Sequence, residues 1–164
     1  MAYLIDGFNL LYKFPECEAL MLQNKLDVAR TRLLSILKEY IQITDQKVRI
    51  VFDGKKQPSL DIKNESVGFI DVFYSLDYSA DFLIKEFIKK DINPRMTTVV
   101  TSDNGIISFV QKFGVRLMKS EVFADKVMKT IDEYHEEKTQ EKDENPNISD
   151  EDVRYWEKMF KMKR

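Results

Sequence analysis

Four aspartates stand at points of this 164-residue sequence where an apolar run stops or a helix begins. They are Asp6, Asp53, Asp81 and Asp103. If the fold brings them together, their charges repel, because two like charges about 4 Å apart cost roughly 4 kcal/mol at an effective dielectric near 20. A group of carboxylates in one cleft therefore needs protons or a cation.

The rest of the sequence limits which cation such a group could hold. With Cys17 as the one cysteine and His135 as the one histidine, the chain has no Cys/His metal cluster and no internal disulfide. Carboxylate oxygens favour Mg²⁺ or Mn²⁺, which keep several waters for substrate phosphates. Asn9, Ser102 and Asn104 could add neutral oxygens or donors around the carboxylates. The sequence therefore predicts an oxygen-only site for Mg²⁺ or Mn²⁺.

Each aspartate also has a structural explanation when it is taken alone. Asp is favoured in turns and at helix N-termini, where its side chain accepts hydrogen bonds from free N–H groups and meets the positive end of the dipole. The functional interpretation therefore depends on whether the fold makes the four side chains converge.

Apolar spacing along the chain predicts strands that alternate with helices. We expect strands at residues 3–5, 48–52, 68–75, 97–101 and 115–118. We expect helices at residues 25–43, 79–90 and 104–112, and another that begins at residue 120. Ser79 suits the N-cap of the second of these helices, and residues 55–66 are expected to form a polar loop.

This alternation predicts a three-layer α/β domain with a mostly parallel central sheet of about five strands, helices on both faces and a C-terminal helix. At 164 residues the chain is long enough for one domain with a substantial core. In such a sheet the carboxyl ends of the parallel strands lie along one edge, where ligands bind. We therefore expect the four aspartates at that edge.

Charge is unevenly distributed over the chain, whose formal net charge is -2. Residues 132–152 hold ten Asp or Glu and two Lys, which leaves 24 Lys and Arg against 18 Asp and Glu elsewhere. A basic body is compatible with a polyanionic partner, and equally with an ordinary solvated surface. Because the sequence shows neither a long apolar span nor a signal peptide, we expect a cytoplasmic protein with no membrane partner.

The ordered motifs resemble those of a known family. Asp6-Gly7-Phe8-Asn9 is similar to the D-G-[YF]-N start of NYN-domain nucleases. The stretches 51–53, 79–81 and 99–103, which end in the other three aspartates, follow in the order found in the YacP-like branch. Residues 29–34 and 114–120 also resemble that branch, so the resemblance covers roughly residues 3–125.

The resemblance implies a PIN-like fold and a metal-dependent endoribonuclease, and some members of the branch act on mRNA associated with ribosomes. It assigns the catalytic and metal-binding roles to Asp6, Asp81 and Asp103, with Asn9 and Asp53 in support. Ser102 and Asn104, which could add neutral oxygens or donors, join the supporting set. Many PIN-like nucleases carry a further acidic residue where Gly105 stands here, which leaves the number of metals open.

The expected reaction is phosphodiester hydrolysis by an activated water, which leaves a 5'-phosphate and a 3'-hydroxyl. This chemistry does not exclude DNA, so the preference for RNA, and for mRNA and the ribosome as partners, comes from the resemblance. Lysines near the predicted edge could bind substrate phosphates, although each could equally be a solvated surface residue. They are Lys13, Lys55, Lys56 and Lys85.

Aromatic residues after the first strand could stack on bases, and at least one of them is expected in the core. They are Phe8, Tyr12 and Phe14. The sequence leaves open whether Arg30 and Arg32 face the edge.

The last quarter of the chain is expected to differ from the nuclease domain, which we place at residues 1–135. Residues 136–148 are acidic and polar and predict a linker, and residues 149–164 predict an amphipathic helix with Trp156 and Met159 on its apolar face. Two interpretations stay open for this helix, since it could dock on the domain or serve as an adaptor for a ribosome or another protein.

Other function classes fit less well. A haloacid-dehalogenase-type phosphatase needs a general-acid Asp two residues after its first Asp, where this sequence has Phe8. A nucleotide hydrolase would need a glycine-rich phosphate loop, and no such motif occurs. The remaining alternative is a noncatalytic RNA-binding or ribosome-associated scaffold with a PIN-like fold.

Overall fold

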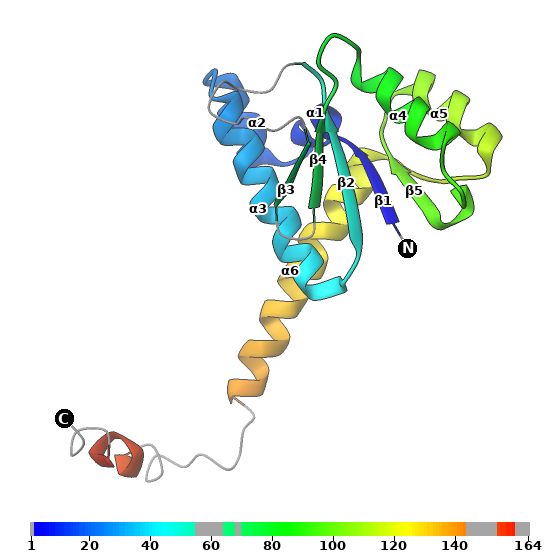
Figure 1. Ribbon diagram of the computed structural model, residues 1–164. Coiled ribbons are helices and arrows are strands. Elements are labelled where there is room, and N and C mark those ends of the chain that lie inside the picture. The colour runs from blue at the N-terminus through cyan, green and yellow to red at the C-terminus, as the bar shows by residue number, and fades with distance from the viewer. Residues whose placement is uncertain (1, 55–63, 68–69, 144–153, 160–164) are drawn as a thin grey trace. The chain divides into compact units, whose positions relative to one another are not determined.

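The computed structural model describes residues 2–54, 64–67, 70–143 and 154–159. Its centre is a six-stranded sheet in the order β3-β4-β2-β1-β5-β6 (Figure 1). The strands are β1 (Ala2–Asp6), β2 (Lys47–Phe52), β3 (Asn64–Val67), β4 (Ile70–Tyr74), β5 (Thr97–Val100) and β6 (Arg116–Met118). Five strands are parallel, and β3 pairs antiparallel with β4. The predicted mostly parallel sheet is confirmed.

One prediction at the edge of the sheet was wrong. Residues 64–66 were expected at the end of a polar loop, but they belong to β3. Their composition, Asn-Glu-Ser, lacks the apolar alternation by which strands are recognised, and pairing with β4 makes them a strand. The rest of the expected loop, residues 55–63, lies outside the described residues.

Successive residues of the central strand face opposite helical layers, as the two-residue period of a strand requires. Tyr3 and Ile5 pack with α1 (Gly7–Leu11), α2 (Pro15–Leu22), α3 (Leu26–Thr44) and the first half of α6 (Ser120–Asp143). Leu4 packs on the other face with α4 (Ala80–Lys89) and α5 (Asn104–Val110). The domain therefore has the predicted three layers.

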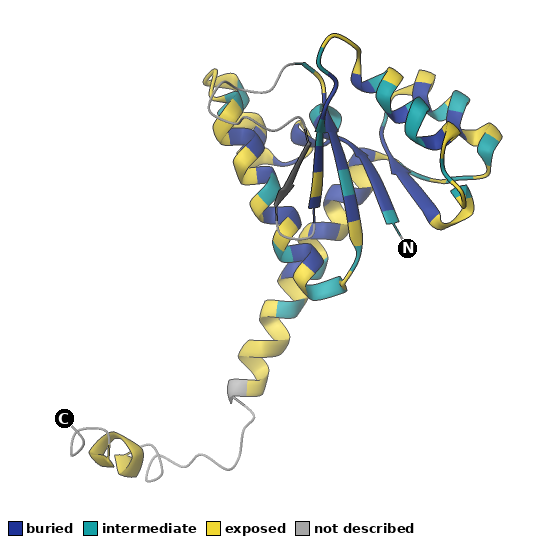
Figure 2. Cartoon of the chain, in the orientation of Figure 1, coloured by how far each residue is buried: buried dark blue, intermediate teal, exposed yellow. Residues whose placement is uncertain are grey.

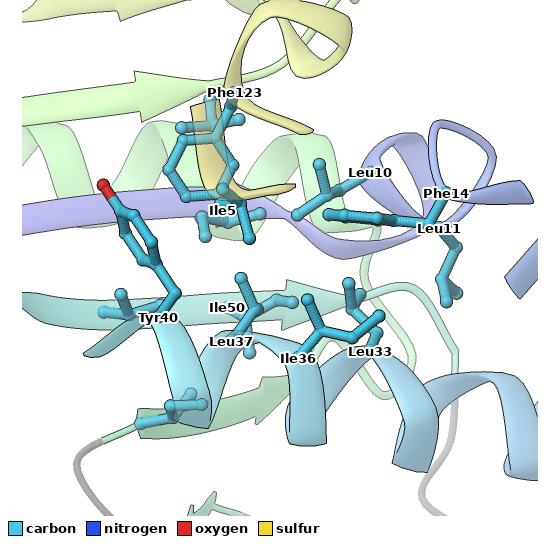
Figure 3. Packing of buried hydrophobic residues seen from close by; sticks show 14 of the residues in the cluster. Ile5, Leu10, Leu11, Phe14, Leu33, Ile36, Leu37, Tyr40, Ile50 and Phe123 are labelled. Atoms are coloured by element: carbon cyan, nitrogen blue, oxygen red, sulfur yellow. The ribbon is translucent and has the colours of Figure 1, made fainter. Parts of the chain in front are cut away.

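The larger core lies on the α3 and α6 face of the sheet (Figure 3). Leu33 and Leu37 of α3 are fully buried there with Ile50 of β2. The Phe123 ring of α6 lies 5.0 Å from that of Tyr3 and 5.8 Å from that of Tyr40. Large buried rings of this kind contribute much of the burial energy of a core.

Most helix bounds match the sequence pattern within one or two residues, because apolar spacing and caps determine them locally. Ser79 is the N-cap of α4 as predicted, since its Oγ accepts a hydrogen bond from the N–H of Phe82 at 3.0 Å. The expected helix at residues 104–112 divides into α5 and a 3-10 turn, Gln111–Phe113. The short helices α1 and α2 were not predicted, since five and eight residues give too little periodicity.

The C-terminal part forms a second compact unit, residues 132–164. Helix α6 continues to Asp143, so the expected start of a linker at residue 136 falls inside a helix. Residues 144–153, which include the rest of that linker, lie outside the described residues. Residues 154–159 are helical and exposed, as Figure 2 shows, and include Tyr155 and Trp156. The division into a nuclease domain, linker and C-terminal helix stays a prediction.

None of the helices in the described part of the chain has both the length and the apolar character needed to cross a bilayer.

Gly7 is required by a close approach between α1 and β2. A Cβ at this position would lie 2.5 Å from Cδ1 of Phe52 and 2.8 Å from the carbonyl oxygen of Val51. The constraint on Gly7 is therefore steric. We therefore expect Gly7→Ala to lower the free energy of unfolding by about 1–3 kcal/mol, as overpacked cores do.

Urea denaturation of the wild type, Gly7→Ala, Phe52→Leu and the double variant tests this. Removing the Phe52 ring should relieve part of the clash, so the double variant should lose less than the two single losses combined. Equal stability of Gly7→Ala and the wild type would contradict the steric explanation.

Candidate functional site at the carboxyl edge of the sheet

The central position of β1 determines where the predicted residues meet. β1 pairs with β2 on one side and β5 on the other, so the residues that follow these three strands leave the sheet at one edge. Asp6 ends β1 and Asp53 follows β2. Thr101, Ser102 and Asp103 follow β5 and lead into α5.

Asp6 is the buried carboxyl of this edge, with 9% of the residue exposed. The Oγ1 of Thr101 donates a hydrogen bond to its Oδ2 at 3.0 Å. The pKa of Asp6 is raised to about 6, mainly because burial disfavours the charged form. Hydrogen bonds from Thr101 and the Asn9 N–H lower the pKa, and the nearby charges of Asp103 and Asp53 contribute to raising it. Asp6 therefore interacts electrostatically with two of the other predicted carboxylates, those of Asp103 and Asp53.

Asp103 caps α5 through one carboxylate oxygen. Its Oδ1 accepts hydrogen bonds from the N–H groups of Gly105 at 2.8 Å and Ile106 at 3.2 Å. The N–H of Asp103 donates to the Thr101 Oγ1 at 3.1 Å. Thr101 thus bridges Asp6 and Asp103, and both the structural and the functional explanation apply to Asp103.

Asp81 approaches the same place from α4. A Cβ added to Gly105 would lie 3.1 Å from Oδ1 of Asp103 and 4.0 Å from Oδ2 of Asp81. The two carboxylates therefore border the space that the glycine leaves open. The other oxygen of Asp81, Oδ1, forms an ion pair with Nζ of Lys85 at 2.8 Å.

Asp53 is exposed and is held toward β4 rather than toward β5. Its Oδ1 accepts a hydrogen bond from Oγ of Ser75 at 3.0 Å, and that Oγ in turn accepts the N–H of Gly54 at 2.9 Å. Asp53 contributes negative charge near Asp6, and this placement suits the supporting role predicted for it.

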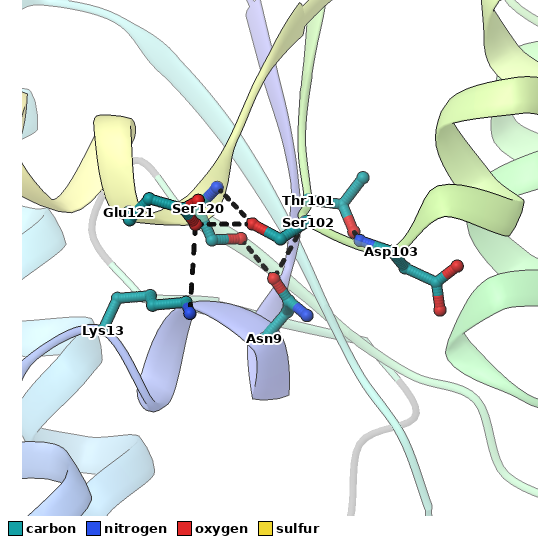
Figure 4. A network of polar contacts seen from close by, with 7 residues as sticks. All are labelled: Asn9, Lys13, Thr101, Ser102, Asp103, Ser120 and Glu121. Atoms are coloured by element: carbon teal, nitrogen blue, oxygen red, sulfur yellow. Dashed lines mark hydrogen bonds and ion pairs between the residues drawn. The ribbon is translucent and has the colours of Figure 1, made fainter.

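Asn9 is the hub of a polar network at the edge (Figure 4). Its Oδ1 accepts hydrogen bonds from the N–H of Ser102 at 2.9 Å and from the hydroxyl of Ser120 at 2.6 Å. The N–H of Ser120 donates to Oγ of Ser102 at 3.1 Å. Helix α1, the loop after β5 and the start of α6 are therefore joined through one amide oxygen.

Sequence reasoning missed Ser120 as a site residue. It is fully buried, and the sequence identified it only as the start of a helix. Its position in the motif Lys119-Ser120, directly after the last parallel strand, was the available signal. Because β6 ends at the same edge of the sheet as β1, the residues just after it, including Ser120, could have been predicted to lie near Asp6.

The same network reaches the surface at Glu121. Ser102 Oγ donates to Oε2 of Glu121 at 2.7 Å, and Nζ of Lys13 lies 3.9 Å from that oxygen. The Ser102 hydrogen bond is the main reason that the pKa of Glu121 lies below its usual range. Lys13 is therefore at the edge but beside a carboxylate. Asn104 begins α5, is exposed, and is not hydrogen-bonded to the network within the described residues.

The predicted substrate contacts have mixed outcomes. Lys55 and Lys56 lie outside the described residues. Phe14 is 2% exposed and belongs to the core, as expected for at least one of the three aromatic residues, so it is not available for stacking on a base. Tyr12 is 55% exposed at the end of α1, and Phe8 is half-buried against Phe52.

Arg30, whose direction the sequence left open, faces this end of the sheet. It is 8% exposed, and its guanidinium carbon lies 5.5 to 5.8 Å from the ring centres of Phe8, Phe52 and Tyr74. Its ion-pair partner is Asp27, at 3.7 Å. Arg30 therefore keeps a permanent positive charge within the aromatic packing next to the edge.

The donor chemistry of the edge fits a hard divalent cation. Carboxylate oxygens from β1, α4 and the start of α5 are its charged groups, and Gly105 leaves space beside two of them. Within the described ranges, however, no three His, Cys, Asp or Glu side chains are already grouped as a metal site. Lys85 and the N-terminus of α5 supply the positive partners of Asp81 and Asp103 instead.

Comparison with known proteins gives one family and one fold. The model of the YacP-like NYN domain matches residues 3–161. The solved structure of Rae1 (YacP) from Bacillus subtilis is similar, with a TM-score of 0.70 and 20% identity over 99% of this chain and 91% of that chain. The structure of a tryptophan-to-leucine variant of that protein is also similar, with a TM-score of 0.70 and 20% identity over 91% of this chain and 87% of that chain. No curated protein matches the chain by sequence.

The burial of Asp6 makes stability depend on pH. Because the pKa rises from 3.8 in the unfolded chain to about 6 in the folded protein, the folded protein binds more protons between these values. The free energy of unfolding therefore falls as the pH rises through this window. Asp6→Asn removes that penalty, so we expect it to be more stable than the wild type by up to about 3 kcal/mol above pH 6 in EDTA, and equally stable below pH 3.8.

Urea denaturation across this pH range, with Asp125→Asn as control, measures the effect. Asp125 is exposed on α6, so its variant should show no comparable gain. A gain for Asp6→Asn that does not change with pH would contradict the assignment to burial of the charge.

The Asn9 network should contribute to stability, whereas Asn104 should not. Asn9→Ala leaves the Ser102 N–H and the buried Ser120 hydroxyl without their acceptor, which we expect to cost about 1–3 kcal/mol. Asn104→Ala is the matched control and should stay within about 0.5 kcal/mol of the wild type. Chemical denaturation decides, and equal losses in the two variants would count against the hub.

Proposed function

Because the chain belongs to the YacP-like NYN domain family, a nuclease-like family, we propose that it is a metal-dependent endoribonuclease that hydrolyses RNA phosphodiester bonds. The observation that carries the proposal is the buried Asp6, whose pKa is raised to about 6 beside Asp103 and Asp53 at the carboxyl edge. Perturbed carboxyls of this kind cluster at functional sites. A site for phosphate chemistry can use them only if a cation offsets their charge.

We assign the metal to Asp6, Asp81 and Asp103, which would hold Mg²⁺ or Mn²⁺ through oxygen. When bound, such an ion neutralises charge on the phosphodiester and lowers the pKa of a water in its shell. Thr101 orients Asp6 and Asp103 at once, and the N-terminus of α5 fixes one oxygen of Asp103. The carboxylate oxygens of these three residues would be the ligands of the ion.

Lys85 supports the assignment of Asp81 as a group that needs a positive partner. Its ammonium lies 2.8 Å from Oδ1 of Asp81 and serves as the positive partner that a bound cation would otherwise provide. On metal binding Lys85 would be displaced from Asp81, and its charge would then be available to a substrate phosphate. Lys13 would act similarly from its place beside Glu121. Lys55 and Lys56 complete the proposed RNA-binding set.

Hydrolysis on this site joins the water oxygen to phosphorus and releases the 3' oxygen with a proton, which leaves a 5'-phosphate. We extend the proposal to mRNA on ribosomes because the resemblance of the motifs points to that branch of the family. The proposed location is the cytoplasm.

A second candidate is a noncatalytic RNA-binding or ribosome-associated scaffold. The observation in its favour is that Asp81 is already neutralised by Lys85, and that no three potential ligands among the described side chains stand grouped for a metal. Against it, exposed and buried carboxylates at one edge repel phosphates and would weaken a pure RNA-binding surface.

Cleavage of a labelled single-stranded RNA distinguishes the two candidates. We expect Mn²⁺ or Mg²⁺ to support cleavage, EDTA to abolish it, and Asp6→Asn, Asp81→Asn and Asp103→Asn each to lower the rate at least about a hundredfold, because even outer-shell changes cost 10- to 100-fold. Asp125→Asn is the matched control and should cleave at the wild-type rate.

Thermal unfolding should show that each variant is folded. Cleavage that is unaffected by EDTA and by all three substitutions would exclude the enzyme. If free RNA is not cleaved, the same variants should be compared on translating ribosomes, and an absence of cleavage there favours the scaffold.

A further inference from the structure

An exposed pair of aromatic rings flanks the proposed metal ligand Asp81. Tyr78 and Phe82 are 67% and 44% exposed, and their rings are stacked with centroids 4.9 Å apart and planes 17° from parallel. Single exposed apolar residues are common on protein surfaces. The two rings stack on one another and both stay exposed, so the aromatic face outside the pair is open to solvent, which a core does not require.

The backbone beneath the pair is fixed by hydrogen bonds. The N–H of Tyr78 donates to the carbonyl of Ser75 at 3.0 Å, and the N–H of Phe82 donates to Oγ of Ser79 at 3.0 Å. Leu76, at a φ of 57°, turns the chain between Ser75 and Tyr78 and donates its N–H to the carbonyl of Gly54 at 3.0 Å. The rings therefore project from a preformed turn, so a ligand that binds them has little ordering to impose.

The same turn is joined to the carboxyl edge. Ser75, whose carbonyl accepts the Tyr78 N–H, donates its hydroxyl to Asp53 at 3.0 Å. Asp81 precedes Phe82 in the first turn of α4, and its carboxylate borders the open space at Gly105. In Figure 1 this segment leads from β4 into α4, and Figure 2 shows it largely exposed.

We propose that Tyr78 and Phe82 form a stacking platform for an unpaired base of the RNA strand whose phosphate reaches the aspartates. The proposal rests on the proposed function and specifies its substrate as single-stranded. A phosphate held by a cation at Asp81 would lie near Phe82, the next residue of α4, so its neighbouring base could reach the ring pair. Aromatic side chains bind single strands by stacking, with little sequence preference, because every base has a π face.

Lys85 strengthens the preference for a nucleic acid over a protein partner. It lies one turn along α4 from Asp81, and it offers a positive charge to the backbone of a strand whose base rests on the rings. Protein anchors, by contrast, are usually inserted into desolvated pockets.

Binding of a fluorescein-labelled single-stranded oligoribonucleotide to the full chain tests the platform, with Ca²⁺ in place of Mg²⁺ or Mn²⁺ so that a cation offsets the carboxylates, and with a gel to show that the probe stays intact. We expect Tyr78→Ala and Phe82→Ala each to raise the Kd roughly tenfold, as removal of a stacking ring does. Tyr78→Phe should bind like the wild type, and Tyr78→Leu, which keeps apolar bulk without the π face, should bind like Tyr78→Ala. Ile92→Ala is the control, because Ile92 is a fully exposed apolar residue beyond the other end of α4.

An oligonucleotide series with one abasic position at a time gives the direct test. At one position the missing base should weaken binding to the wild type but not to Tyr78→Ala. Equal abasic penalties in both proteins, unchanged binding by Tyr78→Ala, or no RNA binding by the wild type would each overturn the platform, and unchanged binding would indicate a protein-contact surface instead.

The cleavage assay keeps this test separate from the nuclease proposal. Stacking with no cleavage of either free RNA or mRNA on translating ribosomes refutes the enzyme and retains the platform. Cleavage with a wild-type Kd in Tyr78→Ala refutes the platform and retains the enzyme.

Discussion

The burial of a carboxyl group at the end of the central strand is the constraint on which the carboxyl edge depends. Asp6 is desolvated and lies near two other aspartates, so its charged form is disfavoured until a proton or a cation offsets it. The surrounding structure partly compensates with donors from Thr101 and the Asn9 backbone. Those two residues in turn orient Asp103 and the start of α6. The polar network therefore follows from the need to place one buried charge.

Local signals were sufficient to predict most of the sheet and the strand ends. Apolar runs that stop at an aspartate identify β1 and β2. Ser79 caps α4 through a hydrogen bond from the N–H of Phe82, only three residues further along the chain. Such features depend on neighbours in the sequence, so one sequence is enough to recognise them. The preference for parallel crossover connections then puts the carboxyl ends of the strands at one edge, and with them Asp6, Asp53 and Asp103.

The features that escaped prediction depend on contacts between distant residues. The hydroxyl of Ser120 meets Asn9 across 111 residues, and no local pattern marks either as the partner of the other. Phe14 and Phe8 have the same aromatic character in the sequence, yet the packing of α2 and α3 buries the first and leaves the second partly accessible. The pairing of Lys85 with Asp81 shows the same limit, because helical spacing permits the pair but the site determines what it does.

Gly105 illustrates how a departure from the family pattern can be understood in physical terms. Where many PIN-like nucleases carry an acidic side chain, this chain leaves open space bordered by Asp81 and Asp103. A further carboxylate there would add repulsion to an edge where the charged form of Asp6 is already disfavoured by desolvation. Without it, two positive groups, Lys85 and the N-terminus of α5, are enough to balance Asp81 and Asp103 in the absence of an ion. An edge whose charges are balanced in this way can fold before it binds a cation. The carboxyl group that still lacks a positive partner is Asp6, at the end of the central strand between β2 and β5.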